Sequence, residues 1–189
     1  MGTFSNGISY YDFKQVSKQS NDSGDLLETY IYSFKSPKTR MRYIAEVERY
    51  RYDLYAIKFY LKIHQNSSDR FTMLTNLYEA RPVIYTCIAI LVAIFRQNAK
   101  ASFAFIGSPT PKEIEREKRD ARQKKENCTQ RFRIYSTLMS TFFSEFYFEH
   151  CASFRHSLYL MRNKSTHCTT KEIQTMINTI YNINVNDLE

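Results

Sequence analysis

Arginines and tyrosines alternate between residues 40 and 52, and this combination of side chains could bind nucleic acid. Guanidinium groups form paired hydrogen bonds with phosphates, and tyrosine rings stack on the bases of single strands. The arginines are Arg40, Arg42, Arg49 and Arg51, and the interleaved tyrosines are Tyr43, Tyr50 and Tyr52. The competing interpretation is structural: the arginines face solvent on a strand, and the tyrosines fill the core.

Two further arginines could bind an anion at the start of a helix. Arg131 and Arg133 follow Thr129 and Gln130 at the expected N-terminus of an amphipathic segment. The helix dipole places partial positive charge there. The whole chain carries 27 Lys and Arg against 19 Asp and Glu, a net charge of +8. Such an excess favours acidic partners, nucleic acid first among them.

A ribonuclease active site is an alternative to simple nucleic-acid binding. Arg162 and His167 match the R-N-x-x-x-H signature of HEPN ribonucleases. The resemblance implies that the two side chains share one helix face, activate the ribose 2'-hydroxyl and stabilise the scissile phosphate. HEPN domains are all-helical bundles, which conflicts with the strands expected earlier in this chain.

Other chemistry is not indicated. The cysteines are far apart and lack zinc-ligand spacing, and no G-x-S-x-G nucleophile motif occurs. They are Cys87, Cys128, Cys151 and Cys168. We expect no metal, no cofactor and reduced thiols in the cytoplasm. The longest apolar run, residues 82–95, is shorter than the roughly 20 residues of a membrane span, so no membrane association is expected.

Hydrophobic periodicity predicts the elements that position these residues. Period-two alternation over residues 27–63 predicts an antiparallel meander. Helical periodicity predicts core helices over 78–98 and 129–143, with the short strand ASFAFIG between them. Residues 145–164 fit either a hairpin that turns near Ser153 or one continuous helix. The end of the chain predicts a helix capped by Thr169 or Thr170, which could cover the sheet or dock on a partner.

The stretch SFAFIGSPTPKE, residues 102–113, predicts a strand-to-helix corner. A phosphate cradle needs several glycines whose backbone N–H groups converge on an anion, and this stretch has only Gly107. Thr110 and Glu113 have capping-box spacing, with Pro111 at the first helical position. Residues 112–126 are charged all round, which predicts a solvent-exposed helix.

The fold class is therefore α+β: a mixed, largely antiparallel sheet with two core helices and an extra C-terminal helix. We expect a flexible segment over residues 1–26, a single domain over 27–168 and the C-terminal helix within 169–189. A protein partner or a second copy of the chain could dock on that last segment.

The order of elements over residues 28–164 resembles the GNAT acyltransferase scaffold. FAFIG resembles its fifth strand, TQRFRIYSTLMSTFF its fourth helix and SLYLMRNK its closing strand. The resemblance implies that Tyr135 would be the general acid of an N-acyltransferase. The coenzyme A loop of the family contains glycines, whereas HQNSSDRFTMLTN at the equivalent place has none, so backbone amides could not approach a pyrophosphate closely.

The chain also contains the short motifs F-x-F-I-G, R-F-R-x-Y and F-E-H, and in these it resembles a group of small bacterial proteins without an assigned activity. Together these observations favour a cytoplasmic binding or accessory protein on a GNAT-like scaffold, without a cofactor. It would act on nucleic acid or on a protein partner through a basic surface. The alternative is an enzyme, either an N-acyltransferase using Tyr135 or a HEPN-like ribonuclease using Arg162 and His167.

Overall fold

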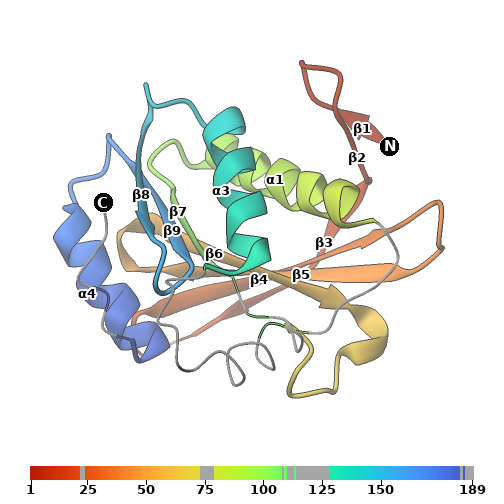
Figure 1. The fold of residues 1–189 in the computed structure, drawn as a ribbon, viewed down its shortest axis with the longest axis horizontal. Helices are drawn as coiled ribbons and strands as arrows, with labels where there is room; N and C mark the ends of the chain where they lie inside the picture. The colour runs from red at the N-terminus through yellow and green to blue at the C-terminus, as the bar shows by residue number, and fades with distance from the viewer. Residues whose placement is uncertain are drawn as a thin grey trace.

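The computed structural model describes residues 1–21, 24–72, 79–107, 109, 113, 128–183 and 185. Its main sheet contains β3 (Phe13–Ser20), β4 (Leu26–Lys35), β5 (Arg42–Tyr50), β6 (Leu54–Leu61), β7 (Ser102–Ile106), β8 (Phe148–Ser153) and β9 (Leu158–Asn163). The strand order is β3-β4-β5-β6-β7-β9-β8 (Figure 1). All neighbours are antiparallel except β6 and β7. The expected α+β class and largely antiparallel sheet are confirmed.

Alternating side chains explain why the central strands form. In β5, Tyr43, Ala45 and Val47 are completely buried, while Arg42 is exposed and Glu46 is half-buried. Successive strand residues point to opposite faces of a sheet, so this pattern gives β5 one apolar face. The meander expected over residues 27–63 corresponds to β4, β5 and β6.

The first 26 residues differ from the flexible segment that the sequence suggested. They contain the paired strands β1 (Gly2–Thr3) and β2 (Ser9–Tyr10), followed by β3, which pairs with β4 at one edge of the main sheet. The sequence of β3, FKQVSKQS, is mostly polar. An edge strand with few buried side chains gives a weak hydrophobic signal, which explains why the pattern did not indicate it.

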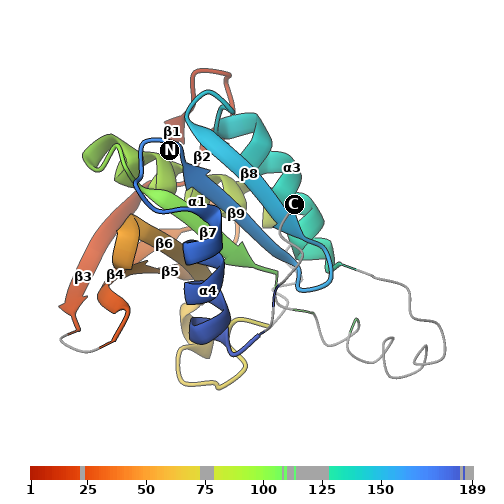
Figure 2. The ribbon, with the colours of Figure 1, turned by 90° about the vertical axis from the view of Figure 1, so that its left-hand side faces the viewer.

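Two helices cover one face of the sheet, α1 (Ala80–Gln97) and α3 (Gln130–Phe142) (Figures 1 and 2). They confirm the two expected core helices. By length and composition alone α1 could cross a membrane, but half of it is buried inside the protein. Its side chains Cys87, Ile88 and Ile90 are at most 1% exposed. The same apolar sequence therefore serves as a core helix.

The third helix, α4 (Thr170–Tyr181), packs on the opposite face of the sheet. It begins with a capping box between Thr169 and Glu172. Ile173 and Ile177 are completely buried and belong to one apolar cluster with Leu160 of β9. The expected C-terminal helix is confirmed over 170–181, and its apolar face packs on its own sheet.

Residues 145–164 form the hairpin alternative and not a continuous helix. β8 and β9 are paired from Phe148↔Asn163 to Ser153↔Leu158. The turn between them contains Ser157 with a φ of 50°, the left-handed conformation that tight turns use. This hairpin forms the second edge of the main sheet.

Gly107 makes the corner between β7 and α3 possible. A Cβ atom at this position would lie 2.8 Å from the backbone nitrogen of Phe132 and would clash with the Thr129 side chain. Thr129 Oγ1 donates to Gly107 O at 3.0 Å and accepts from Phe132 N at 3.2 Å, which caps α3. The expected corner is present, but the capping box at Thr110 and most of the charged segment 112–126 lie outside the described residues.

Candidate functional site

The turn between β4 and β5 concentrates positive charge. Its basic side chains are Lys35, Lys38, Arg40 and Arg42, and all four are exposed. Within the described part of the chain, none of them forms an ion pair with a carboxylate. We call residues 35–42 the basic turn. Exposed cations attract phosphates most strongly when no carboxylate neutralises them.

The basic turn concentrates this charge at a cost in stability. Lys35 and Arg42 are directly opposite each other on β4 and β5, and like charges in that position are destabilising. Arg40 has a φ of 59°, a left-handed backbone conformation that is uncommon for residues other than glycine. An anion bound between these side chains would offset the repulsion.

A buried carboxylate anchors the basic turn. Glu79, just before α1, is 2% exposed and accepts hydrogen bonds from Ser36 Oγ at 2.5 Å and Thr39 Oγ1 at 2.9 Å. The hydroxyls of Tyr11 and Tyr43 donate to the same carboxylate at 3.4 Å. Buried charges need such donors because they have lost their water. The turn is thus tied to the core through Glu79.

Ser36 also organises the backbone of the turn. Its Oγ accepts hydrogen bonds from the backbone nitrogens of Lys38 at 3.1 Å and Thr39 at 3.0 Å. A surface hollow of about 600 Å³ lies beside it. Lys35 and Arg40 contribute to its lining, and so does Asp12, whose carboxylate pairs with the amino group of Met1. A phosphate in this hollow could approach two cations held on a fixed backbone.

The arginines at the other end of β5 are neutralised. Arg49 Nη1 lies 3.0 Å from Glu28 Oε2, and its Nη2 lies 2.7 Å from Asp53 Oδ1. Arg51 Nε lies 3.4 Å from Asp25 Oδ1. Among the residues that the structure describes, Arg40 and Arg42 in the basic turn therefore have no carboxylate partner, whereas Arg49 and Arg51 at the opposite end of β5 are paired.

The predicted stacking platform is not formed by the interleaved tyrosines. Tyr43 is 0% exposed and Tyr50 is 5% exposed, and the Tyr50 hydroxyl donates to Glu48 Oε2 at 2.8 Å. Only Tyr52, at 50%, presents much of its ring to solvent, and it lies beyond the paired end of β5. For Tyr43 and Tyr50 the core interpretation holds.

Arg131 and Arg133 lie in different surroundings on α3. Arg131 donates from Nη1 to the carbonyl oxygen of Phe71 and from Nη2 to that of Thr72 at 3.3 Å. Arg133 is exposed and borders a groove between α1 and α3. The backbone nitrogen of Gln130, in the first turn of α3, donates to the Glu113 carboxylate at 2.8 Å. An internal carboxylate thus already occupies part of the helix N-terminus where we expected an external anion.

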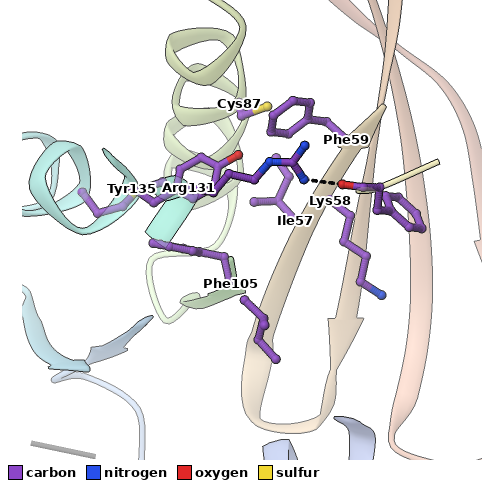
Figure 3. A pocket seen from close by; sticks show the side chains of 10 residues that line it. Ile57, Lys58, Phe59, Cys87, Phe105, Arg131 and Tyr135 are labelled. Atoms are coloured by element: carbon purple, nitrogen blue, oxygen red, sulfur yellow. Dashed lines mark hydrogen bonds between the residues drawn. The ribbon is translucent and has the colours of Figure 1, made fainter. Parts of the chain in front are cut away.

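Tyr135 borders a small cavity where β6 and β7 diverge (Figure 3). The two strands pair only from Leu54↔Ser102 to Ala56↔Ala104, and the cavity of about 40 Å³ beyond them is also lined by Cys87 and Arg131. Burial raises the pKa of the Tyr135 hydroxyl and of the Cys87 thiol far above their ordinary values. This volume is large enough for a few water molecules. The side chain of Arg131 extends from α3 across the opening toward the carbonyl oxygens of Phe71 and Thr72 (Figure 3).

Arg162 and His167 do not share a helix. Arg162 lies on β9, where its Nε is 2.5 Å from Glu149 Oε2 and its Nη1 donates to the carbonyl oxygen of Cys168 at 3.2 Å. His167 is exposed in the turn that follows β9. Asn163 between them is 1% exposed and donates to the carbonyl oxygen of Ala99 at 2.7 Å. The single helix face that the ribonuclease alternative requires does not exist at these residues.

Three residues of the basic turn site were missed by the sequence analysis. Lys35 and Lys38 flank Pro37, a turn-forming residue, and their spacing from Arg40 and Arg42 could have indicated a basic hairpin turn. Glu79 gave no usable signal, because its partners are 36 to 68 residues away in the chain.

Comparison of this chain with protein-family models, curated proteins and solved structures finds no match.

Proposed function

We propose that this chain is a binding protein that contacts the phosphate backbone of nucleic acid through the basic turn. The observation that carries the proposal is the set of four exposed side chains without carboxylate partners in the described part of the chain. They are Lys35, Lys38, Arg40 and Arg42. Each can neutralise one phosphate. Because Tyr43 beside them is buried, recognition depends on backbone charge more than on base identity.

The proposed scaffold is GNAT-like but lacks a coenzyme site. The sheet order with one parallel pair, β6 and β7, supports the resemblance, and so does the position of Tyr135 beside their divergence. Arg131 crosses that opening, and residues 64–76 contain no glycine. The proposed location is the cytoplasm, which agrees with four free cysteines, since oxidising compartments favour disulfides.

Fluorescence anisotropy tests this function with labelled single-stranded RNA and duplex DNA at several salt concentrations. Four phosphate contacts predict that log K for duplex falls by up to about 3.6 per tenfold increase in salt. The combined variant Lys38→Ala, Arg40→Ala and Arg42→Ala should reduce affinity at low salt by at least about tenfold and make the salt dependence about three units shallower.

The control is the combined variant Arg49→Ala and Arg51→Ala, which removes the paired arginines at the opposite end of β5. It should retain the affinity of the unmodified chain, because the two positive charges that it removes are already balanced there by Glu28, Asp53 and Asp25. Equal affinity of the basic-turn variant and the unmodified chain, or binding that does not respond to salt, would rule out the proposal.

An N-acyltransferase is a second candidate, favoured by the position of Tyr135 where the strands diverge. It requires that Arg131 leave the opening, because a cavity of about 40 Å³ cannot hold the arm of coenzyme A. Titration calorimetry with acetyl-coenzyme A on the unmodified chain and on Arg131→Ala tests this requirement. Binding that strengthens in Arg131→Ala supports the second candidate, and no heat with either protein removes it.

A further inference from the structure

The two edges of the main sheet differ in how they are protected. Edge strands expose unpaired backbone groups, and proteins usually protect them with charged residues or bulges. β3 has both kinds of protection: Lys14 and Lys18 are exposed, and its register shifts between Gln15 and Ser17. This edge is poorly suited to pairing with another strand.

β8, at the opposite edge, has no lysine and no bulge, and its one charged residue, Glu149, is paired with Arg162 of the neighbouring β9. Its sequence, FEHCAS, contains no lysine, arginine or proline, and its pairing with β9 is continuous in register. Within the described part of the chain no strand pairs with its outer side. The second edge of the sheet is therefore open to strand addition.

The backbone of β8 directs hydrogen-bonding groups outward. Lys164 N donates to Tyr147 O at 2.9 Å, so the carbonyl group of Tyr147 is directed toward β9, while its N–H donates to Ser144 O in the preceding turn. Bonded and non-bonded positions alternate along an antiparallel pair. The N–H and C=O groups of His150 and Ala152 are therefore directed away from β9 and require water or another strand as a partner.

Exposed aromatic side chains lie at both ends of β8. Phe146 is 78% exposed just before the strand, and Phe154 is 57% exposed just after it. A two-fold axis through His150 places the start of one β8 beside the end of the other. Phe146 and Phe154 are each four residues from His150, so they flank the strand ends that this axis brings together. Such a contact uses the same surface on both copies, as a two-fold interface requires.

Charge complementarity supports the same register. Glu145 and Arg155 are exposed and lie five residues before and after His150. Neither forms an ion pair with another side chain within the residues that the structure describes. Antiparallel pairing brings Glu145 of one copy to the end of β8 that carries Arg155 in the other, and this occurs twice by symmetry.

We propose that two copies of this chain form a homodimer by antiparallel pairing of their β8 strands about His150. The two sheets then join into one continuous sheet. The hydrogen bonds come from the outward groups of His150 and Ala152, and the apolar contacts join Phe146 to Phe154 of the other copy. This proposal does not depend on the basic turn or on nucleic-acid binding.

Sedimentation velocity over a range of concentrations tests the dimer. The unmodified chain should show a concentration-dependent equilibrium between monomer and dimer. Phe146→Lys and Phe154→Lys should each raise the dissociation constant at least tenfold. Val16→Lys is the matched control, because Val16 is 48% exposed on the protected edge strand β3, and it should leave the dissociation constant unchanged.

A charge rescue tests the register. Phe146→Lys combined with Phe154→Glu in one chain should restore association relative to either single variant, since opposite charges then meet at both ends of the pair. Hydrogen exchange on the unmodified chain should slow at the amides of His150 and Ala152 as concentration rises, whether or not a variant folds. A monomer at all concentrations, a dimer insensitive to both lysine variants, or unprotected amides at these two residues would overturn the proposal.

Discussion

The two ends of the β4–β5 hairpin use the same residue type for opposite purposes. At the paired end, Arg49 bridges Glu28 and Asp53, and its charge contributes to stability. At the basic turn, Arg42 lies opposite Lys35, and its charge costs stability. The difference shows that a count of arginines on a strand does not identify a binding surface. The partners set by the strand register decide which charges remain available to a ligand.

The largest effect should come from removing the anchor of the basic turn. Glu79→Ala leaves the hydroxyls of Ser36 and Thr39 without their buried acceptor, and we expect unfolding free energy to fall by about 3 kcal/mol. Denaturant unfolding followed by circular dichroism measures it. Glu79→Gln, which keeps an acceptor oxygen, should lose less; an equal loss would mean that the hydroxyl bonds do not anchor the turn.

Acid should weaken the paired end selectively. Hydrogen bonds from Lys18, Tyr30 and Arg49 lower the pKa of Glu28 from 4.5 to about 2. A carboxyl with a pKa lower in the folded than in the unfolded state stabilises the protein above the unfolded pKa. That contribution, about 2 kcal/mol once solvent screening of the partly exposed partners is allowed for, should disappear as the pH falls from about 4.5 to about 2.

Unfolding free energies measured between pH 7 and pH 2 check this expectation. Glu28→Gln should flatten the acid limb of the profile, since the amide cannot be protonated in this range. Asp69→Asn is the control, because the exposed Asp69 side chain forms no ion pair within the described residues. An unchanged acid limb in Glu28→Gln would contradict the assignment.

Arg49→Ala should destabilise the protein by about 1.5 kcal/mol, because two partly buried carboxylates lose a shared partner. Arg51→Ala should change stability by less than about 0.5 kcal/mol, since its pair with Asp25 is largely exposed. Thermal unfolding of the two variants measures the difference. Similar losses of stability in the two variants would contradict the expectation that Arg49 stabilises this end and Arg51 does not.

The smallest expected change in stability is an increase. Arg42→Glu converts the like-charge pair with Lys35 into an opposite-charge pair, which should stabilise the hairpin by about 0.5 kcal/mol and reduce nucleic-acid affinity. Lys100→Glu, an exposed position in another turn, makes the same change in net charge. If both variants bind nucleic acid equally well, net charge and not the basic turn determines the affinity.

Much of the fold could be predicted because local patterns determine it. The alternation in β5 and the capping box of Thr169 and Glu172 are readable from neighbouring residues, and both elements are present. β3 could not be predicted from its polar sequence, because its stability comes from pairing with β4. The strand is defined by its neighbour more than by its own composition.

The site was only partly predictable for a related reason. Arg42 and Arg49 look alike in sequence, and the ion pair that distinguishes them joins Arg49 to Glu28, 21 residues away. The register of β4 against β5 brings these two side chains together. Sequence patterns indicated that strands of this kind exist, but they did not indicate which charged residues face one another.

The corner at Gly107 has a consequence for the order in which the protein assembles. The start of α3 is held by Thr129, whose partners Gly107 and Ser157 are 22 and 28 residues away and belong to the ends of β7 and of the β8–β9 turn. The cap itself is local, because Thr129 Oγ1 accepts from Phe132 N, but Thr129 gains its bonds to Gly107 and Ser157 only when the end of β7 and the β8–β9 turn lie side by side. Although helices usually form quickly, the start of this one is fixed to the sheet only after distant strands have met.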